Sequence, residues 1–234
     1  SYIFVFLLII ASILPWSTIS KGSKNNPRKT FNGKAVGGIS LIKAVKEKTF
    51  WGFFFIFCFT AVGIFGISLH VVAYLVYVGL SEVQAAFSFG IAGMLNFVGM
   101  VLTGLAADKW PRHIVASVSY LLSFIAIFSL ALMQLYPSII FLILFILGFG
   151  LSAGARGPII TTLMAEIFAG KGLASIYGAT NLGQGLGAAA GALLAGFLFD
   201  LTGGYNFGFL ICIVFTFLGA VLFWTVPQIR HAKI

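Results

Sequence analysis

One basic side chain of this sequence, Arg156, lies inside a long apolar segment. An arginine near the centre of a membrane helix costs about 2.5–3.5 kcal/mol on insertion scales, so it persists where water, carbonyl groups or an anion can face it. Its planar guanidinium can hold a carboxylate through two parallel hydrogen bonds. We therefore predict that Arg156 binds an anionic ligand in a polar cavity. The alternative is a structural arginine that donates to carbonyl groups of neighbouring helices.

Three polar residues that follow Arg156 in the sequence share one face of a helical segment. Tyr177, Asn181 and Gln184 are spaced by four and three residues, which places them on one side of a helix. They are predicted to contact substrate or water. Hydrogen bonding between helices is the other interpretation.

Asn96 and His70 are two further polar residues within apolar segments. Asn96 has the same two interpretations, substrate contact or hydrogen bonding between helices. His70 can change charge near neutral pH, but it lies in the outer third of its segment, so we do not expect it to share a small ligand with Arg156. Tyr74 follows one turn later, and this spacing favours a His–Tyr pair at the membrane interface, with substrate contact as the alternative.

Glycines repeat at every fourth residue in the segment that carries the three polar residues. Gly183, Gly187 and Gly191, continued by Ala195, form a row of small residues on one helix face. Such a row allows another backbone to approach closely. We predict that this row packs against a second helix, while the polar face of the same segment meets polar surroundings.

Other chemistry finds little support in the sequence. Cys58 and Cys212 each lie in an apolar run, and the 3 histidines are scattered, so neither a disulfide nor a metal site is expected. The glycines at 183, 185 and 187 imitate a dinucleotide-binding turn, but no strand precedes them. No nucleophile–base pair and no paired carboxylates are visible. The sequence therefore predicts neither an enzyme nor a bound cofactor.

The composition is typical of a protein that crosses a membrane several times. Hydrophobic residues make up 60% of the sequence and charged residues 8%, whereas soluble domains carry about 25% charged residues. A span needs about 20 apolar residues, and lipid offers the backbone no hydrogen bonds, so each apolar segment is predicted to be helical. The expected full spans are 50–76, 84–106, 114–134, 138–164, 173–198 and 206–226. Residues 1–17 are interpreted as the end of a preceding transmembrane helix.

The basic residues other than Arg156 fall on one side of this arrangement. Residues 18–49 form a basic linker ahead of the six-span region 50–234, and further Lys and Arg follow the second, fourth and sixth spans. The positive-inside rule places the linker and the C-terminus in the cytoplasm. We expect a multi-pass protein of the cell (inner) membrane. The net charge of +9 is thereby explained as a topology signal, so no nucleic-acid partner is expected.

The six spans contain an internal repeat of three helices. The second and fifth spans both end in Gly-x-x-x-Asp, at Gly104–Asp108 and Gly196–Asp200. Because three helices reverse the direction of the following unit, the two aspartates end on opposite sides, as in inverted repeats. The third helix of each unit is poor in glycine and is predicted to lie at the periphery, with the other four around a centre.

The segment Gly104–His113 resembles the cytoplasmic loop motif of the major facilitator superfamily, although a proline stands at 111 where the family often has glycine. The matching residues are Gly104, Asp108, Lys109 and Arg112. The resemblance covers nearly the whole chain and implies an all-helical C-terminal half of such a transporter, preceded by an N-terminal six-helix half. Residues Glu166–Tyr205 are most similar to the monocarboxylate and oxalate/formate antiporter branch.

This resemblance implies a secondary active transporter that moves a small organic anion, a mono- or dicarboxylate, by alternating access. The first helix of each repeat would line a central cavity, and the matching loop residues would form a latch that steadies one access state. Symport with a proton and exchange for a counter-anion both stay open, because no Asp or Glu lies deep in a span. The alternatives are a non-transport membrane sensor or assembly protein on the same fold, and a transporter of a non-anionic solute.

Overall fold

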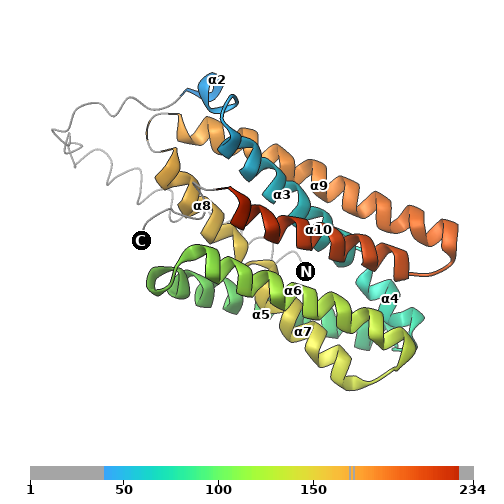
Figure 1. The fold of residues 1–234 in the computed structure, drawn as a ribbon. Coiled ribbons are helices and arrows are strands. Elements are labelled where there is room, and N and C mark those ends of the chain that lie inside the picture. Colours follow the sequence, from blue (N-terminus) through green and yellow to red (C-terminus); the bar gives the residue numbers. More distant parts are fainter. Residues whose placement is uncertain (1–39, 169, 171, 227–234) are drawn as a thin grey trace, which may run out of the picture. The chain divides into compact units, whose positions relative to one another are not determined.

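The computed structural model describes residues 40–168, 170 and 172–226, and the regular elements in this part of the chain are helices. Figure 1 shows their arrangement. They are α2 (Leu41–Ala44), α3 (Lys48–Ser68), α4 (Val71–Tyr77), α5 (Glu82–Lys109), α6 (Arg112–Leu135), α7 (Ile139–Ala153), α8 (Arg156–Ile167), α9 (Leu173–Thr202) and α10 (Asn206–Thr225). The helix end predicted at 1–17 and the linker residues 18–39 lie outside the described residues, as do Lys171, Arg230 and Lys233.

Within the described residues, six helical segments are long and apolar enough to cross a membrane, which confirms the number of full spans predicted from residue 50 onward. They are Lys48–Ser68, Glu82–Lys109, Arg112–Leu135, Ile139–Ile167, Leu173–Thr202 and Asn206–Thr225. Each overlaps one predicted span, and several extend further into polar sequence. α5, for example, begins at Glu82 because Ser81 and Gln84 form a capping box, in which each side chain bonds the backbone N–H of the other residue.

Two of the predicted spans are interrupted, which corrects the expectation of one helix across 50–76 and across 138–164. α3 ends at Ser68 and α4 begins at Val71. The second interruption separates α7 from α8 at Gly154 and Ala155. There the sequence supplies a cause, because Pro158 has no N–H to donate to the carbonyl of Gly154.

The glycine row of α9 packs directly against the backbone of α3, which runs alongside it (Figure 1). At Gly183, Gly187 and Gly191, a carbonyl oxygen of α3 stands so close that a Cβ atom would collide with it. The three oxygens belong to Phe54, Cys58 and Val62. The four-residue spacing therefore recurs on both helices. This is the close approach that the sequence pattern predicts.

A matching contact joins α5 and α7. A Cβ atom on Gly99 of α5 would collide with the carbonyl oxygen of Leu151, and one on Gly150 of α7 would lie 2.8 Å from the carbonyl oxygen of Ala92. In both contacts, the first helix of one repeat meets the middle helix of the other. The two repeats are thus interlocked rather than merely placed side by side.

The third helix of the first repeat, α6, has two different faces. One face of α6 contributes Val115, Tyr120 and Ile127 to the two buried apolar clusters. The opposite face exposes large side chains such as Phe124 and Phe128. α6 is therefore a supporting helix with one outward face.

Candidate functional site

Arg156 is the first residue of α8, and only 2% of its surface is exposed. Its Nε donates to Ser119 Oγ (3.3 Å), and its Nη2 donates both to the Ser119 carbonyl oxygen (3.2 Å) and to Ser123 Oγ. The guanidinium carbon lies 4.1 Å from the centroid of the Tyr120 ring. This is a cation–π geometry, which is strongest where water is excluded.

The partners of Arg156 are themselves joined to other helices. The Tyr120 hydroxyl and Thr60 Oγ1 on α3 are hydrogen bonded at 2.6 Å, and Ser123 Oγ donates to Ser152 Oγ on α7 at 2.7 Å. The resulting Arg156 cluster consists of Thr60, Ser119, Tyr120, Ser123, Ser152 and Arg156. It ties α3, α6, α7 and α8 together inside the apolar interior.

These contacts favour the structural interpretation of Arg156 over a ligand contact. The side chain points to α6, where Nε and Nη2 donate to two serines and a backbone carbonyl. No carboxylate is paired with it among the described residues. The bond to the Ser119 carbonyl is the structural alternative that the sequence left open. A signal for it was available, because Ser119 and Ser123 are spaced by four and so share one helix face.

The three polar residues of α9 meet different surroundings, although they share a side of the helix. The ring of Tyr177 packs edge-on against Phe57 of α3, with 6.0 Å between centroids. Asn181 is exposed and Gln184 is half-buried. Tyr177 therefore belongs to the packing with α3, whereas Asn181 is open to a ligand or to a neighbouring element.

Asn96 and His70 each lie at one of the two helix interruptions. The side-chain oxygen of Asn96 packs so tightly on Gly154 that a Cβ atom there would collide with it. His70 Nε2 lies 3.1 Å from the carbonyl oxygen of Ala192 on α9. The expected pairing of His70 with Tyr74 is wrong, because the Tyr74 hydroxyl donates to the carbonyl of Leu130 on α6 instead.

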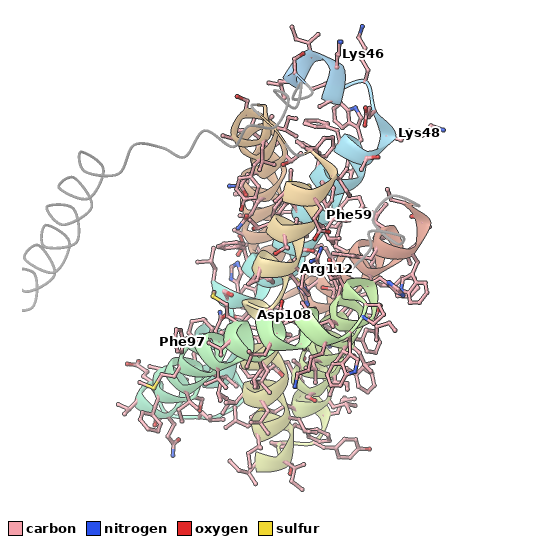
Figure 2. All side chains as sticks on the ribbon, turned by 90° about the vertical axis from the view of Figure 1, so that its left-hand side faces the viewer. Lys46, Lys48, Phe59, Phe97, Asp108 and Arg112 are labelled. Atoms are coloured by element: carbon pink, nitrogen blue, oxygen red, sulfur yellow. The ribbon has the colours of Figure 1, made fainter. Side chains whose placement is uncertain are left out.

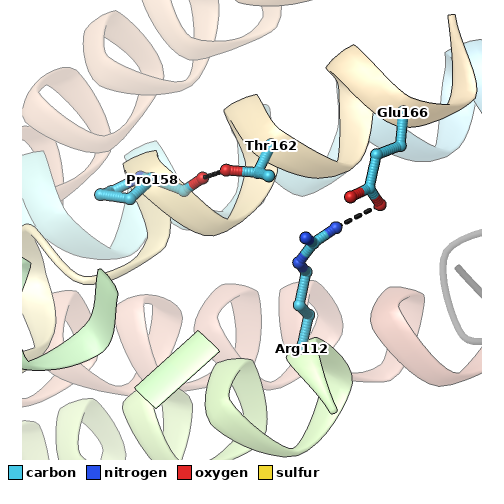
Figure 3. A network of polar contacts seen from close by, with 4 residues as sticks. All are labelled: Arg112, Pro158, Thr162 and Glu166. Carbon is cyan, nitrogen blue, oxygen red and sulfur yellow. Dashed lines mark hydrogen bonds and ion pairs between the residues drawn. The ribbon is translucent and has the colours of Figure 1, made fainter. Parts of the chain in front are cut away.

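At the end of the bundle that is predicted to be cytoplasmic, Arg112 forms an ion pair with Glu166 (Figure 3). Arg112 is the first residue of α6, and Glu166 lies in the last turn of α8. Their side chains are 13% and 38% exposed, so water reaches the pair. In the same view, Thr162 Oγ1 donates to the carbonyl of Pro158 at 2.7 Å, along α8.

The other predicted latch residues stand apart from this pair. Asp108 and Lys109 end α5 and are exposed; Asp108 and Arg112 are both labelled in Figure 2. Neither takes part in an ion pair within the part of the chain that the structure describes. A Cβ atom on Gly104 would meet nothing within 4 Å. The sequence reasoning placed Arg112 at a latch but missed Glu166 as its partner.

Comparisons with known proteins agree with this architecture. The family profile described as Major Facilitator Superfamily matches residues 1–188. Monocarboxylate transporter 13 of Rattus norvegicus is 26% identical over 226 residues, which cover 94% of this chain and 52% of that protein. Monocarboxylate transporter 12 of Mus musculus is 28% identical over 179 residues, 75% of this chain and 36% of that protein. The chain thus spans about half or less of the length of these curated relatives.

Among solved structures, a peptide transporter POT crystallised with sulfate superimposes with a TM-score of 0.69 at 21% identity. The match covers 78% of this chain and 38% of that one. At this level of identity, the likeness shows the fold alone. It agrees with two interlocked three-helix repeats.

Proposed function

Because the chain belongs to the Major Facilitator Superfamily, we propose that it forms half of a secondary active transporter that moves a small organic anion by alternating access. A second six-helix unit of the same protein would supply the opposite wall of the substrate path. The coupling partner would be a co-transported proton or an exchanged counter-anion. The linker and the C-terminus would face the cytoplasm, as the distribution of Lys and Arg favours.

The observation that carries this proposal is the relation to Monocarboxylate transporter 13, which extends over 94% of the chain. The name of that relative favours a monocarboxylate as the substrate class here. The interrupted helix α7–α8 also fits a transporter, since a break near the middle of a span frees backbone groups at the depth where substrates bind.

Arg156 is not assigned to substrate in this proposal, because its side chain is buried and its Nε and Nη2 donate to α6. The exposed Asn181 and the half-buried Gln184 on α9 are assigned instead as contacts for the carboxylate. A side-chain amide can donate two hydrogen bonds to such a group. Asn96 and His70 are assigned to the helix interruptions, close to the substrate path.

Uptake into liposomes tests this function. The full-length protein would be reconstituted, and a labelled monocarboxylate supplied with a proton gradient, with an unlabelled carboxylate inside, or with neither. We expect uptake above that of empty liposomes in one of the driven arms. Asn181→Ala and Gln184→Ala are expected to raise KM by about tenfold, the loss of roughly one hydrogen bond to a charged group.

The outcomes separate the alternatives. If neither variant changes uptake, Asn181 and Gln184 do not contact the substrate carboxylate. Uptake of neutral solutes but not of carboxylates would replace the anion by another substrate. No uptake of any solute would favour a membrane sensor or assembly protein on the same fold.

A further inference from the structure

Two arginines bridge α6 and α8 in opposite directions. Arg112 reaches from the first residue of α6 to Glu166 in the last turn of α8, and Arg156 reaches from the first residue of α8 back to Ser119 and Ser123 of α6. The two helices are thus joined at both ends of α8. In Figure 1, α8 diverges from α6 toward its C-terminal end, whereas α7 stays beside α6. Long side chains are needed to span that distance.

The two bridges differ in how easily they can open. Water reaches Arg112 and Glu166, and exposed ion pairs exchange readily with solvent and are weakened by salt. Arg156 is 2% exposed, so water cannot readily replace its partners on α6, and breaking these bonds would leave a buried charge with fewer hydrogen bonds. The C-terminal end of α8 can therefore separate from α6 easily, whereas its N-terminal end stays bound to α6.

The fixed end coincides with the interruption between α7 and α8. Ser123 accepts a hydrogen bond from Arg156, the first residue of α8, and donates its only hydroxyl proton to Ser152, in the last turn of α7. A single residue of α6 therefore holds both sides of the break. Between these two anchored points lie Ala153, Gly154 and Ala155, and the carbonyl of Gly154 has lost its helical donor at Pro158.

We propose that Arg156 is a positioning residue that pins the start of α8 to α6, so that α8 pivots at Gly154 and Ala155 when the Arg112–Glu166 pair opens. The pivot would move one wall of the substrate path while α7 and α6 stay in place. The role of this pivot in transport rests on the proposed function. The attachment of α8 to α6 by Arg156 does not, because the local motion of α8 can be measured without any substrate.

Amide hydrogen exchange of the full-length protein, read by mass spectrometry over α6, α8 and α9, tests the pin. Glu166→Gln is expected to raise exchange in the last turns of α8 by on the order of tenfold, and to leave Ile159 and Ile160 unchanged. Arg156→Met removes the buried charge along with its bonds, a change that often leaves stability intact. It is expected to raise exchange along α8 from its first turn, with α6 and α9 unaffected.

The control and rescue variants keep this test decisive. Lys48→Gln removes an exposed cation from α3 (Figure 2) and should change exchange nowhere in α8. Arg156→Lys keeps a charge and donors but not the planar face over Tyr120, so it should restore part of the protection. If Arg156→Met does not fold, Ser123→Ala is used instead, and the same rise from the first turn of α8 is expected.

Unchanged exchange in α8 on loss of Arg156, or an equal rise in α9, would overturn the pin, because the residue would then act on the whole bundle or not at all. The expected pattern in a protein that transports no carboxylate would leave the pin standing and remove the proposed function. Carboxylate uptake without the expected exchange pattern in α8 would support the proposed function and overturn the pin.

Discussion

Helices are joined in two different ways in this molecule. Along α3–α9 and α5–α7, backbones meet directly over glycines, whereas α6 and α8 are connected by the side chains of Arg112 and Arg156. Lipid provides no hydrophobic force between helices, so close packing and polar bridges must hold them together. Where two backbones are in direct contact, the helices cannot move closer together without a collision. A side-chain bridge can open one bond at a time, which suits a region that moves.

Widening one of the glycine contacts is expected to destabilise the protein most. In Gly187→Leu, the new Cβ atom would meet the carbonyl oxygen of Cys58, a backbone atom that cannot move aside by changing rotamer. We expect a loss of about 3 kcal/mol or more, at the upper end of overpacking costs. The measurement is the yield of monodisperse protein and its Tm. Gly185→Leu is the matched control, because the same helix offers open space there; equal losses in both variants would contradict the direct-contact interpretation.

Emptying the Arg156 cluster is expected to have the next largest effect. Arg156→Ala leaves a cavity and removes the partner of the Ser119 carbonyl, at a cost of about 2–3 kcal/mol. Arg156→Met fills the space without a charge and should cost less than about 1 kcal/mol. Thermal unfolding of both variants measures the difference. A cost for Arg156→Met as large as that for Arg156→Ala would show that the charge itself stabilises the fold.

A smaller loss is expected when only one bond of the cluster is removed. Tyr120→Phe keeps the ring beneath the guanidinium but loses the hydroxyl that bonds to Thr60. The expected cost is about 1 kcal/mol. In a double-mutant cycle, Thr60→Val should add little once Tyr120 is Phe. Additive losses would mean that the two residues act separately.

The surface bridge should contribute least to stability. Glu166→Gln is expected to cost no more than about 1 kcal/mol, as for other exposed ion pairs. The difference in Tm from the unmodified protein should shrink as salt is raised, since salt screens the pair. A large loss that does not depend on salt would place this bridge in the same class as the Arg156 cluster.

The number of spans and the close helix contacts could be predicted because each depends on a local pattern. Hydropathy and length define a span wherever it lies in the fold, and the spacing of Gly183, Gly187 and Gly191 requires a backbone neighbour whichever helix supplies it. The partner helix α3 could not be named in advance. The break at Gly154 had a local cause in Pro158, whereas the break at His70 has no proline or glycine beside it.

The candidate site was harder to predict because a side chain's direction depends on what lies opposite. The depth of Arg156 follows from its position in the sequence, but the turn of α8 toward Ser119 and Ser123 depends on the packing of three helices. Glu166 was one of several acidic residues on the predicted cytoplasmic side, and the pairing with Arg112 depends on where two distant helix ends meet. Rotation about the helix axis is the quantity that the sequence leaves open.

The interlocking of the two repeats also has a consequence for synthesis. α3 leaves the ribosome well over a hundred residues before the glycines of α9 that receive it, and the contact residues of α5 precede those of α7 by more than fifty residues. Neither triplet can therefore complete its own packing while it is being inserted. The surface of α3 that receives the glycines of α9 can be covered only after α9 has been inserted, and α10, which packs on α3, α6 and α9, follows it.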